Sequence, residues 1–481
     1  MRISRVPDLN KVGVILIFIS SVLLGIWATV HTIALRNVLL GFGGLAAIYY
    51  WSEWLKSLNK SFFGLPPPKL AWAPMALAIS MLLWVLIHFA FFSVDPQRQL
   101  NELSSTWLRS WLALLIGSAT GLVLIGNIKF APWLWLGLVF SFLILIGQYI
   151  PKALQRRSFF GVDFFGDYIY WAKFNGVLAG TILIASLLGL LIDYFRIDLA
   201  QSKAKNTPLI MQARSSYLVP MYSLLGIFLA TYSFVFIFDA KAGVGLSVIL
   251  IAFWVLIGSG LLIIKIVCSK KQKSISTVYF KLAGLFLFIA LASSFLSYKH
   301  VKNNPSWKSL FTDIAISVKI DQYPNWQNPS KYGYPKREDG TAVTGNAYER
   351  ASLAAVGLRL ISMQPLGNGL FRSFPEQVKK LAPEYGIVGF VYTHSAWIDL
   401  GLAFGLGGLI LIPLALLVAI VRAVMGLSGQ YKATIITLSL AILVLYSVGE
   451  YAFQQGVEIL FYICGLVSGL SLTSSPKNVD L

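Results

Sequence analysis

Long apolar runs recur along almost the whole chain and are separated by short polar gaps. Most runs approach the length of about 20 residues that a helix needs to cross a bilayer. Helices are the expected form, because isolated strands cannot satisfy their backbone groups in lipid. The pattern predicts an all-α integral membrane protein with about 12 transmembrane helices. The runs fall near residues 12–31, 37–52, 71–93, 110–126, 130–150, 174–193, 217–237, 243–267, 277–297, 395–421, 432–449 and 457–473.

One polar segment, residues 299–393, is much longer than the other gaps. Loops of this length are usually functional rather than simple connections. The chain therefore divides into residues 1–298 with transmembrane helices 1–9, the loop 299–393, and residues 394–481 with helices 10–12.

The second half of this loop contains a helix signal. Residues 347–363 have helical character, and Gln364 and Pro365 end the predicted helix. Asn346 and Glu349 are three residues apart, which predicts a capping box at the start of the helix.

The composition supports lipid as the main solvent. The chain is 57% hydrophobic and 12% charged, with a mean hydropathy of +0.72, too few charges to cover a soluble protein of this size. The net charge is +19, but the basic residues lie in the gaps between apolar runs. That distribution indicates membrane topology and contact with anionic lipid headgroups, and it does not indicate nucleic-acid binding.

The Lys and Arg residues also predict the orientation. With a cytoplasmic N-terminus, the inside connections carry about twice as many of these residues as the short outside connections. We therefore expect cytoplasmic N- and C-termini and place the loop 299–393 outside the cytoplasm.

The sequence gives no sign of a disulfide framework, a nucleotide-binding motif or a metal site. Cys268 and Cys464 have no evident partner outside the membrane, so both are interpreted as packing residues. The sequence has neither a Walker A loop nor a dinucleotide fingerprint, and His394 has no second His or Cys at metal-ligand spacing. We expect no metal and no cofactor, so the substrate of an enzyme of this kind would arrive already activated.

His394 is the most informative histidine, because it lies where the outer loop meets the next apolar run. An imidazole at a membrane boundary could accept a proton from a hydroxyl group near neutral pH. The alternative is an interfacial residue of an aromatic belt, beside Tyr392 and Trp397.

Arg350 is predicted to lie in the first turn of the loop helix. A cation there faces the positive end of the helix dipole, a small cost that an anion docked at the helix end would offset. The alternative is a solvated arginine paired with Glu349.

Four other basic residues are candidates for phosphate binding. Lys241 lies in a tight outer connection and could bind phosphate or pair with Asp239. Arg372 follows a glycine-containing turn. Arg156 and Arg157 lie on an outer connection, against the general charge bias, and could contact headgroups or a lipid-linked anion.

The ordered set of motifs resembles the superfamily of O-antigen ligases and Wzy O-antigen polymerases. Its signature is an Arg-led helix ending in Pro-Leu-Gly-x-Gly, then a His that opens the next span, then a glycine-rich turn. Here these parts read Arg350-Ala-Ser-Leu, Gln364-Pro-Leu-Gly-Asn-Gly369, His394-Ser-Ala-Trp-Ile and Gly405-Leu-Gly-Gly-Leu409.

This resemblance implies a GT-C-like, metal-independent glycosyltransferase of the bacterial inner membrane. Such enzymes move a glycan from undecaprenyl diphosphate to an acceptor hydroxyl at the periplasmic face. By resemblance, His394 would act as a base or position the acceptor, and Arg350 would hold the diphosphate. The family usually has an arginine where Lys241 stands, so the diphosphate role could lie with Lys241, Arg372 or the pair Arg156 and Arg157.

Several functions fit these features. A ligase that transfers O-antigen to lipid A–core is the first, because a single dominant loop precedes the His-bearing span. An O-oligosaccharyltransferase that modifies pilin or other proteins, and an O-antigen polymerase, are alternatives within the superfamily. A transporter or flippase for lipid-linked glycans is the alternative from a different class; it would leave the outer loop without an evident role.

Overall fold

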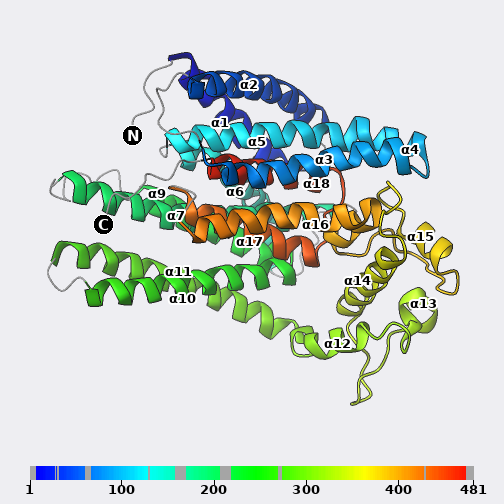
Figure 1. Ribbon diagram of the computed structural model, residues 1–481. Coiled ribbons are helices and arrows are strands. Elements are labelled where there is room, and N and C mark those ends of the chain that lie inside the picture. Colours follow the sequence, from blue (N-terminus) through cyan, green and yellow to red (C-terminus); the bar gives the residue numbers. More distant parts are fainter. Residues whose placement is uncertain are drawn as a thin grey trace.

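The computed structural model describes residues 7–27, 29, 32–59, 67–127, 130–157, 169–205, 218–268, 273–426 and 430–472. These residues form helices joined by loops, and each predicted apolar run falls on a helix (Figure 1). The helices of the bundle are α1 (Pro7–Trp27), α2 (Ile33–Asn59), η1 (Lys69–Trp72), α3 (Ala73–Phe92), α4 (Pro96–Glu102), η2 (Leu103–Trp107), α5 (Leu108–Gly126), α6 (Ala131–Gln155), α7 (Ile169–Lys205), α9 (Leu218–Tyr232), η5 (Ser233–Ile237), α10 (Lys241–Cys268), α11 (Lys273–Asn303), α16 (Ala396–Val424), α17 (Lys432–Val448) and α18 (Gln454–Ser471).

The bundle has the surface of a membrane protein. Seven of the described helices are long and apolar enough to cross a bilayer. Large apolar side chains such as Phe18 and Phe42, both 65% exposed, point away from the bundle. The all-helical, multi-pass membrane class predicted from the sequence is therefore confirmed, whereas the number of about 12 spans stays a prediction.

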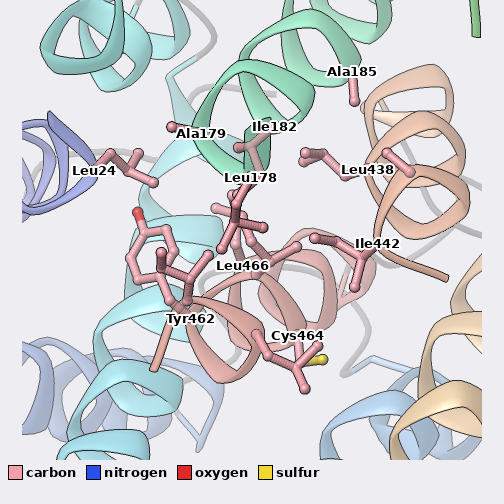
Figure 2. Close-up of a cluster of buried hydrophobic side chains, with 14 of the residues drawn as sticks. Leu24, Leu178, Ala179, Ile182, Ala185, Leu438, Ile442, Tyr462, Cys464 and Leu466 are labelled. Carbon is pink, nitrogen blue, oxygen red and sulfur yellow. The ribbon is translucent and has the colours of Figure 1, made fainter. Parts of the chain in front are cut away.

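Close backbone contact between α5 and α18 forms the centre of the bundle. A Cβ atom on Gly117 would lie 2.1 Å from the carbonyl oxygen of Tyr462, and one on Gly469 would lie 2.2 Å from that of Ser118. Small residues four apart on each helix permit this approach, as is common where helices pack in membranes. Leu178, Ile182, Leu438, Ile442 and Tyr462 belong to the surrounding cluster (Figure 2).

Cys464 also belongs to this core, where it is a buried, free thiol. Its predicted role as a packing residue is confirmed. The side chain of Cys268 lies outside the described part of the structure.

The segment after α11 forms a small helical unit at one end of the bundle (Figure 1), called here the loop unit (residues 304–393). Buried residues of its own core include Trp326, Tyr348, Val356 and Phe374. Its elements are η6 (Pro305–Trp307), α12 (Leu310–Ser317), η7 (Pro324–Gln327), α13 (Pro329–Tyr332), α14 (Gly345–Met363) and α15 (Phe374–Leu381).

The helix predicted over 347–363 is present as α14, and it ends at Met363 as expected. The predicted capping box is wrong. The helix begins at Gly345 after Thr344, and the carboxylate of Glu349 accepts a hydrogen bond from the Tyr334 hydroxyl at 2.6 Å. The N-terminus of α14 is instead capped by a residue from another helix. The backbone N–H of Thr344, the residue before α14, donates to Asp313 Oδ2 at 3.1 Å.

The loop unit is joined to the bundle at a break in α16. Phe404 and Gly405 leave helical geometry, and Gly405 has a φ of 63°. The N–H of Gly369 donates to the Ala403 carbonyl at 2.6 Å, and the N–H of Leu406 donates to the Pro365 carbonyl at 2.8 Å. The two glycine-containing motifs recognised in the sequence thus pack against each other and satisfy each other's backbone groups.

Candidate functional site

His394 lies in the loop just before α16, with a left-handed backbone conformation (φ 60°). Its neighbours fix this loop on both sides. The Thr393 N–H and hydroxyl each donate to Asp399 Oδ1 at 2.9 Å, and the Ala396 N–H donates to the Gly449 carbonyl at 3.0 Å. A strained conformation that its surroundings hold in place is a common feature of functional sites.

The imidazole of His394 is paired with a carboxylate. Nδ1 lies 2.9 Å from Glu450 Oε2, and the two side chains are 14% and 10% exposed. Among the described residues, none forms a hydrogen bond with Nε2. The arrangement holds one ring nitrogen against an acid and leaves the other for a proton donor from outside, which is how a histidine base is oriented.

Arg350 lies in the second turn of α14, one turn later than predicted. Arg350 is half-buried, and its Nη1 donates to the Val448 carbonyl at 2.5 Å. The alternative pairing with Glu349 is not formed, because that carboxylate binds Tyr334.

The last residue of α17 and the connection that follows it, called here the connection 448–450, therefore link both candidates. The consecutive residues Val448, Gly449 and Glu450 contact Arg350, Ala396 and His394, respectively. The structure thus brings together the two residues that the sequence motifs emphasise, although they are 44 positions apart in the chain (350 to 394).

Two lysines add positive charge near Arg350. The charges of Lys173 and Lys241 each interact with that of Arg350. Lys173 Nζ donates to the Asp239 carbonyl at 2.9 Å, and Lys241 Nζ donates to the Ser306 hydroxyl. The three cations, called here the cation cluster (Lys173, Lys241 and Arg350), provide a positive field that suits a phosphorylated ligand.

Asp239 partly balances this field, but Lys241 does not contact it directly. His300 Nε2 lies 2.9 Å from Asp239 Oδ1. The hydrogen bond from His300 holds the pKa of Asp239 below its ordinary value, so the carboxylate is charged at neutral pH. The charges of Asp239 and Lys241 attract each other, but the carboxylate of Asp239 pairs with His300, so among the described contacts the alternative of a direct Lys241–Asp239 pair is not formed.

The other predicted phosphate ligands divide into two groups. Arg372 lies beside the site, because its Nε donates to the Tyr392 hydroxyl at 2.5 Å and its guanidinium lies over the Tyr392 ring. Burial of the Tyr392 side chain raises the pKa of its hydroxyl above the ordinary value. Arg156 and Arg157 follow α6 and are exposed, and the described contacts do not join them to His394 or Arg350.

Sequence reasoning missed the acidic residues near the start of α18. Besides Glu450, the carboxylate of Glu458 is fully buried between Arg36 at 3.1 Å and Arg109 at 2.8 Å. Arg36 is only 1% exposed, and the side chain of Arg109 is 12% exposed. Ionisable groups inside apolar helices are rare and usually functional or paired. This signal applies to Glu458 within α18, whereas Glu450 lies in a connection and carries no such signal.

No protein-family model matches the chain, and no curated protein matches it. The chemistry of the site has to be inferred from its own residues and their positions.

Proposed function

We propose that the protein is a membrane glycosyltransferase of the O-antigen ligase type. It would move a glycan from undecaprenyl diphosphate to a hydroxyl group of lipid A–core at the periplasmic face of the bacterial inner membrane. The observation that carries this proposal is the short connection 448–450, which places the His394–Glu450 pair beside Arg350.

In the proposed reaction, His394 Nε2 accepts the proton of the acceptor hydroxyl. The freed oxygen attacks the anomeric carbon of the donor sugar, and the bond from that carbon to the diphosphate oxygen breaks. Glu450 stabilises the imidazolium that forms, because its carboxylate already lies 2.9 Å from Nδ1. The products are the glycosylated acceptor and undecaprenyl diphosphate, and the proton later leaves His394 for solvent.

The cation cluster has a matching role in this reaction. Negative charge develops on the diphosphate as the bond breaks, and fixed cations that face this charge lower the barrier. Arg350 has the geometry for two parallel hydrogen bonds to phosphate, whereas Lys173 and Lys241 act as point charges. Arg372 would act through Tyr392 rather than on the diphosphate, and Arg156 and Arg157 would contact headgroups.

Deletion of the gene in its host tests the reaction class. A ligase predicts rough lipopolysaccharide together with accumulated lipid-linked O-antigen. Lipopolysaccharide capped by a single repeat would instead identify a polymerase, and unglycosylated pilin with normal lipopolysaccharide would identify a protein-modifying transferase. Lipid-linked glycan trapped on the cytoplasmic face would identify a flippase.

Two arginines of α14 allow a matched test of the diphosphate role. Arg350→Ala should lower transfer by purified, reconstituted protein by about 10²–10³-fold, the usual effect of removing one transition-state donor. Arg359 lies on the same helix but pairs with Asp321 at 2.7 Å, away from the connection 448–450. Arg359→Ala should leave transfer nearly unchanged, and an equal loss in the two variants would contradict the assignment of Arg350.

A further inference from the structure

The helix α12 presents an uncovered apolar face. Phe311 is 84% exposed, Val318 just after the helix is 50% exposed, and Ile314 is 38% exposed. Their spacing of three and four residues places them on one side of the helix. The opposite side contributes Asp313 and Ser317, which are buried against the rest of the loop unit. The helix is therefore amphipathic, with its apolar face outward.

A second exposed apolar surface lies on α11, the helix that precedes this face in the chain. On α11, large apolar residues are exposed in succession up to the end of the helix: Leu287, Phe288, Leu291, Phe295, Tyr298 and Val301. Exposed lysines lie near the end of this apolar stripe, at Lys299 and Lys302 on α11 and at Lys308 and Lys319 on either side of α12. An aromatic residue with lysines at the end of an apolar stripe is typical of the boundary between acyl chains and headgroups.

The start of α12 is held close to this boundary. Trp307 Nε1 donates to His300 Nδ1 on α11 at 3.1 Å, and its ring lies 3.4 Å from the place that a Cβ on Gly245 of α10 would take. Only Lys308 and Ser309 separate Trp307 from the first residue of α12. The lysines also suit the negative surface of a membrane that contains anionic lipids.

We propose that α12 is an interfacial helix whose face of Phe311, Ile314 and Val318 rests in the lipid at the end of the bundle where the loop unit lies. Helices of this kind sit about 5–10 Å into the boundary between headgroups and acyl chains. This inference depends on the membrane fold and is independent of the proposed reaction.

The contact has a consequence for the site. Asp313 of α12 binds Arg337 at 2.6 Å and accepts the Thr344 N–H at the start of α14. Burial opposes the charged form of Asp313, but these hydrogen bonds keep its pKa below the ordinary value. An α12 that rests on the bilayer therefore fixes the height of α14, and of Arg350 on it, relative to the lipid headgroups.

Depth-dependent fluorescence quenching tests the proposal on the full chain in nanodiscs. A single cysteine is introduced as Phe311→Cys or Val318→Cys in a background where Cys268 and Cys464 are alanine, and it is labelled with an environment-sensitive dye. Glu338→Cys, at an exposed position of the same loop unit, is the matched control. The label at 311 or 318 should show blue-shifted emission and several-fold stronger quenching by nitroxide lipids than the label at 338.

Equal quenching at 311, 318 and 338 would overturn the proposal. Energy transfer between labelled copies, without quenching by the nitroxide lipids, would also overturn it and assign the face to a second copy of the chain. As a second check, the double substitution Phe311→Glu and Val318→Glu changes only exposed positions. It should withdraw a label introduced by Ile314→Cys from lipid, and unchanged quenching at 314 would contradict the interfacial position.

Discussion

Two histidines at the same end of the bundle, His300 and His394, are both paired with a carboxylate, but they differ in the contacts of their second ring nitrogen. His300 Nε2 lies 2.9 Å from Asp239, and His394 Nδ1 lies 2.9 Å from Glu450. The second nitrogen of His300 accepts the Trp307 N–H at 3.1 Å, whereas none of the described residues bonds to Nε2 of His394. The side chain of His300 is 1% exposed and that of His394 is 14% exposed.

The difference shows that pairing with an acid does not by itself make a base. An indole N–H can only donate, so Nδ1 of His300 carries no proton and Nε2 carries the one that faces Asp239. That ring links α11 to the connection before α10, and both of its nitrogens have a partner. His394 has the same acid contact, but its other nitrogen is available to a substrate.

The largest expected difference between the two comes from substitution by glutamine. His394→Gln should lower transfer by about 10²–10⁴-fold, because glutamine cannot accept a proton in general base catalysis. His300→Gln keeps a donor for Asp239 and should retain most of the transfer activity. Both variants are assayed with lipid-linked donor after purification as monodisperse protein. Equal activities would contradict the distinction drawn between the two rings.

Substitution of the two paired carboxylates, Glu450 and Asp239, should give a smaller difference in transfer rate. Glu450→Gln removes the charge that stabilises the imidazolium, a loss of about 1.5–3 kcal/mol, or about tenfold to a hundredfold in rate. Asp239→Asn should change the rate less, because Asp239 faces His300 and the lysines rather than His394. The turnover number of each variant at saturating donor separates the two, and a larger loss for Asp239→Asn would show that the carboxylates had been assigned the wrong roles.

The smallest effect should come from Trp307→Phe, which leaves Nδ1 of buried His300 without its donor. We expect a loss of about 1–3 kcal/mol of stability, seen as a lower unfolding temperature, with little change in transfer. Trp133→Phe, at a 61% exposed position, is the control and should leave the unfolding temperature unchanged. In the double variant with His394→Gln, transfer should not return, because a freed nitrogen on His300 lies away from Glu450.

Much of the fold could be predicted from the sequence, because apolar runs in lipid have few alternatives to helices. The boundaries of the helices were harder to predict. The run expected at 110–126 belongs to a helix that begins at Pro96, since α4, η2 and α5 are continuous. A polar first turn that packs against other helices cannot be distinguished from a loop by hydropathy alone.

The candidate site was partly predictable as well. His394 and Arg350 stand in ordered motifs and could be found locally, but Glu450 is contributed by a connection 56 positions further along the chain (394 to 450), and only packing brings it to His394. The contacts of Lys241 also depend on packing. The sequence left a phosphate and Asp239 as alternative partners of Lys241, and the fold brings Ser306 to Lys241 and His300 to Asp239.

The break in α16 has a consequence for how the protein is made. Phe404 and Gly405 interrupt the helix, and residues from the loop unit and from α3 supply the missing partners, including Trp84 Nε1 at 2.8 Å from the Phe404 carbonyl. Unpaired backbone groups are costly in a bilayer. The span carrying the break can reach its final state only after the preceding loop unit has folded against it. Folding of the broken region of α16 and folding of the loop unit are thus one coupled step. A loop grafted from another protein would have to supply the same hydrogen-bond partners to the backbone at the break.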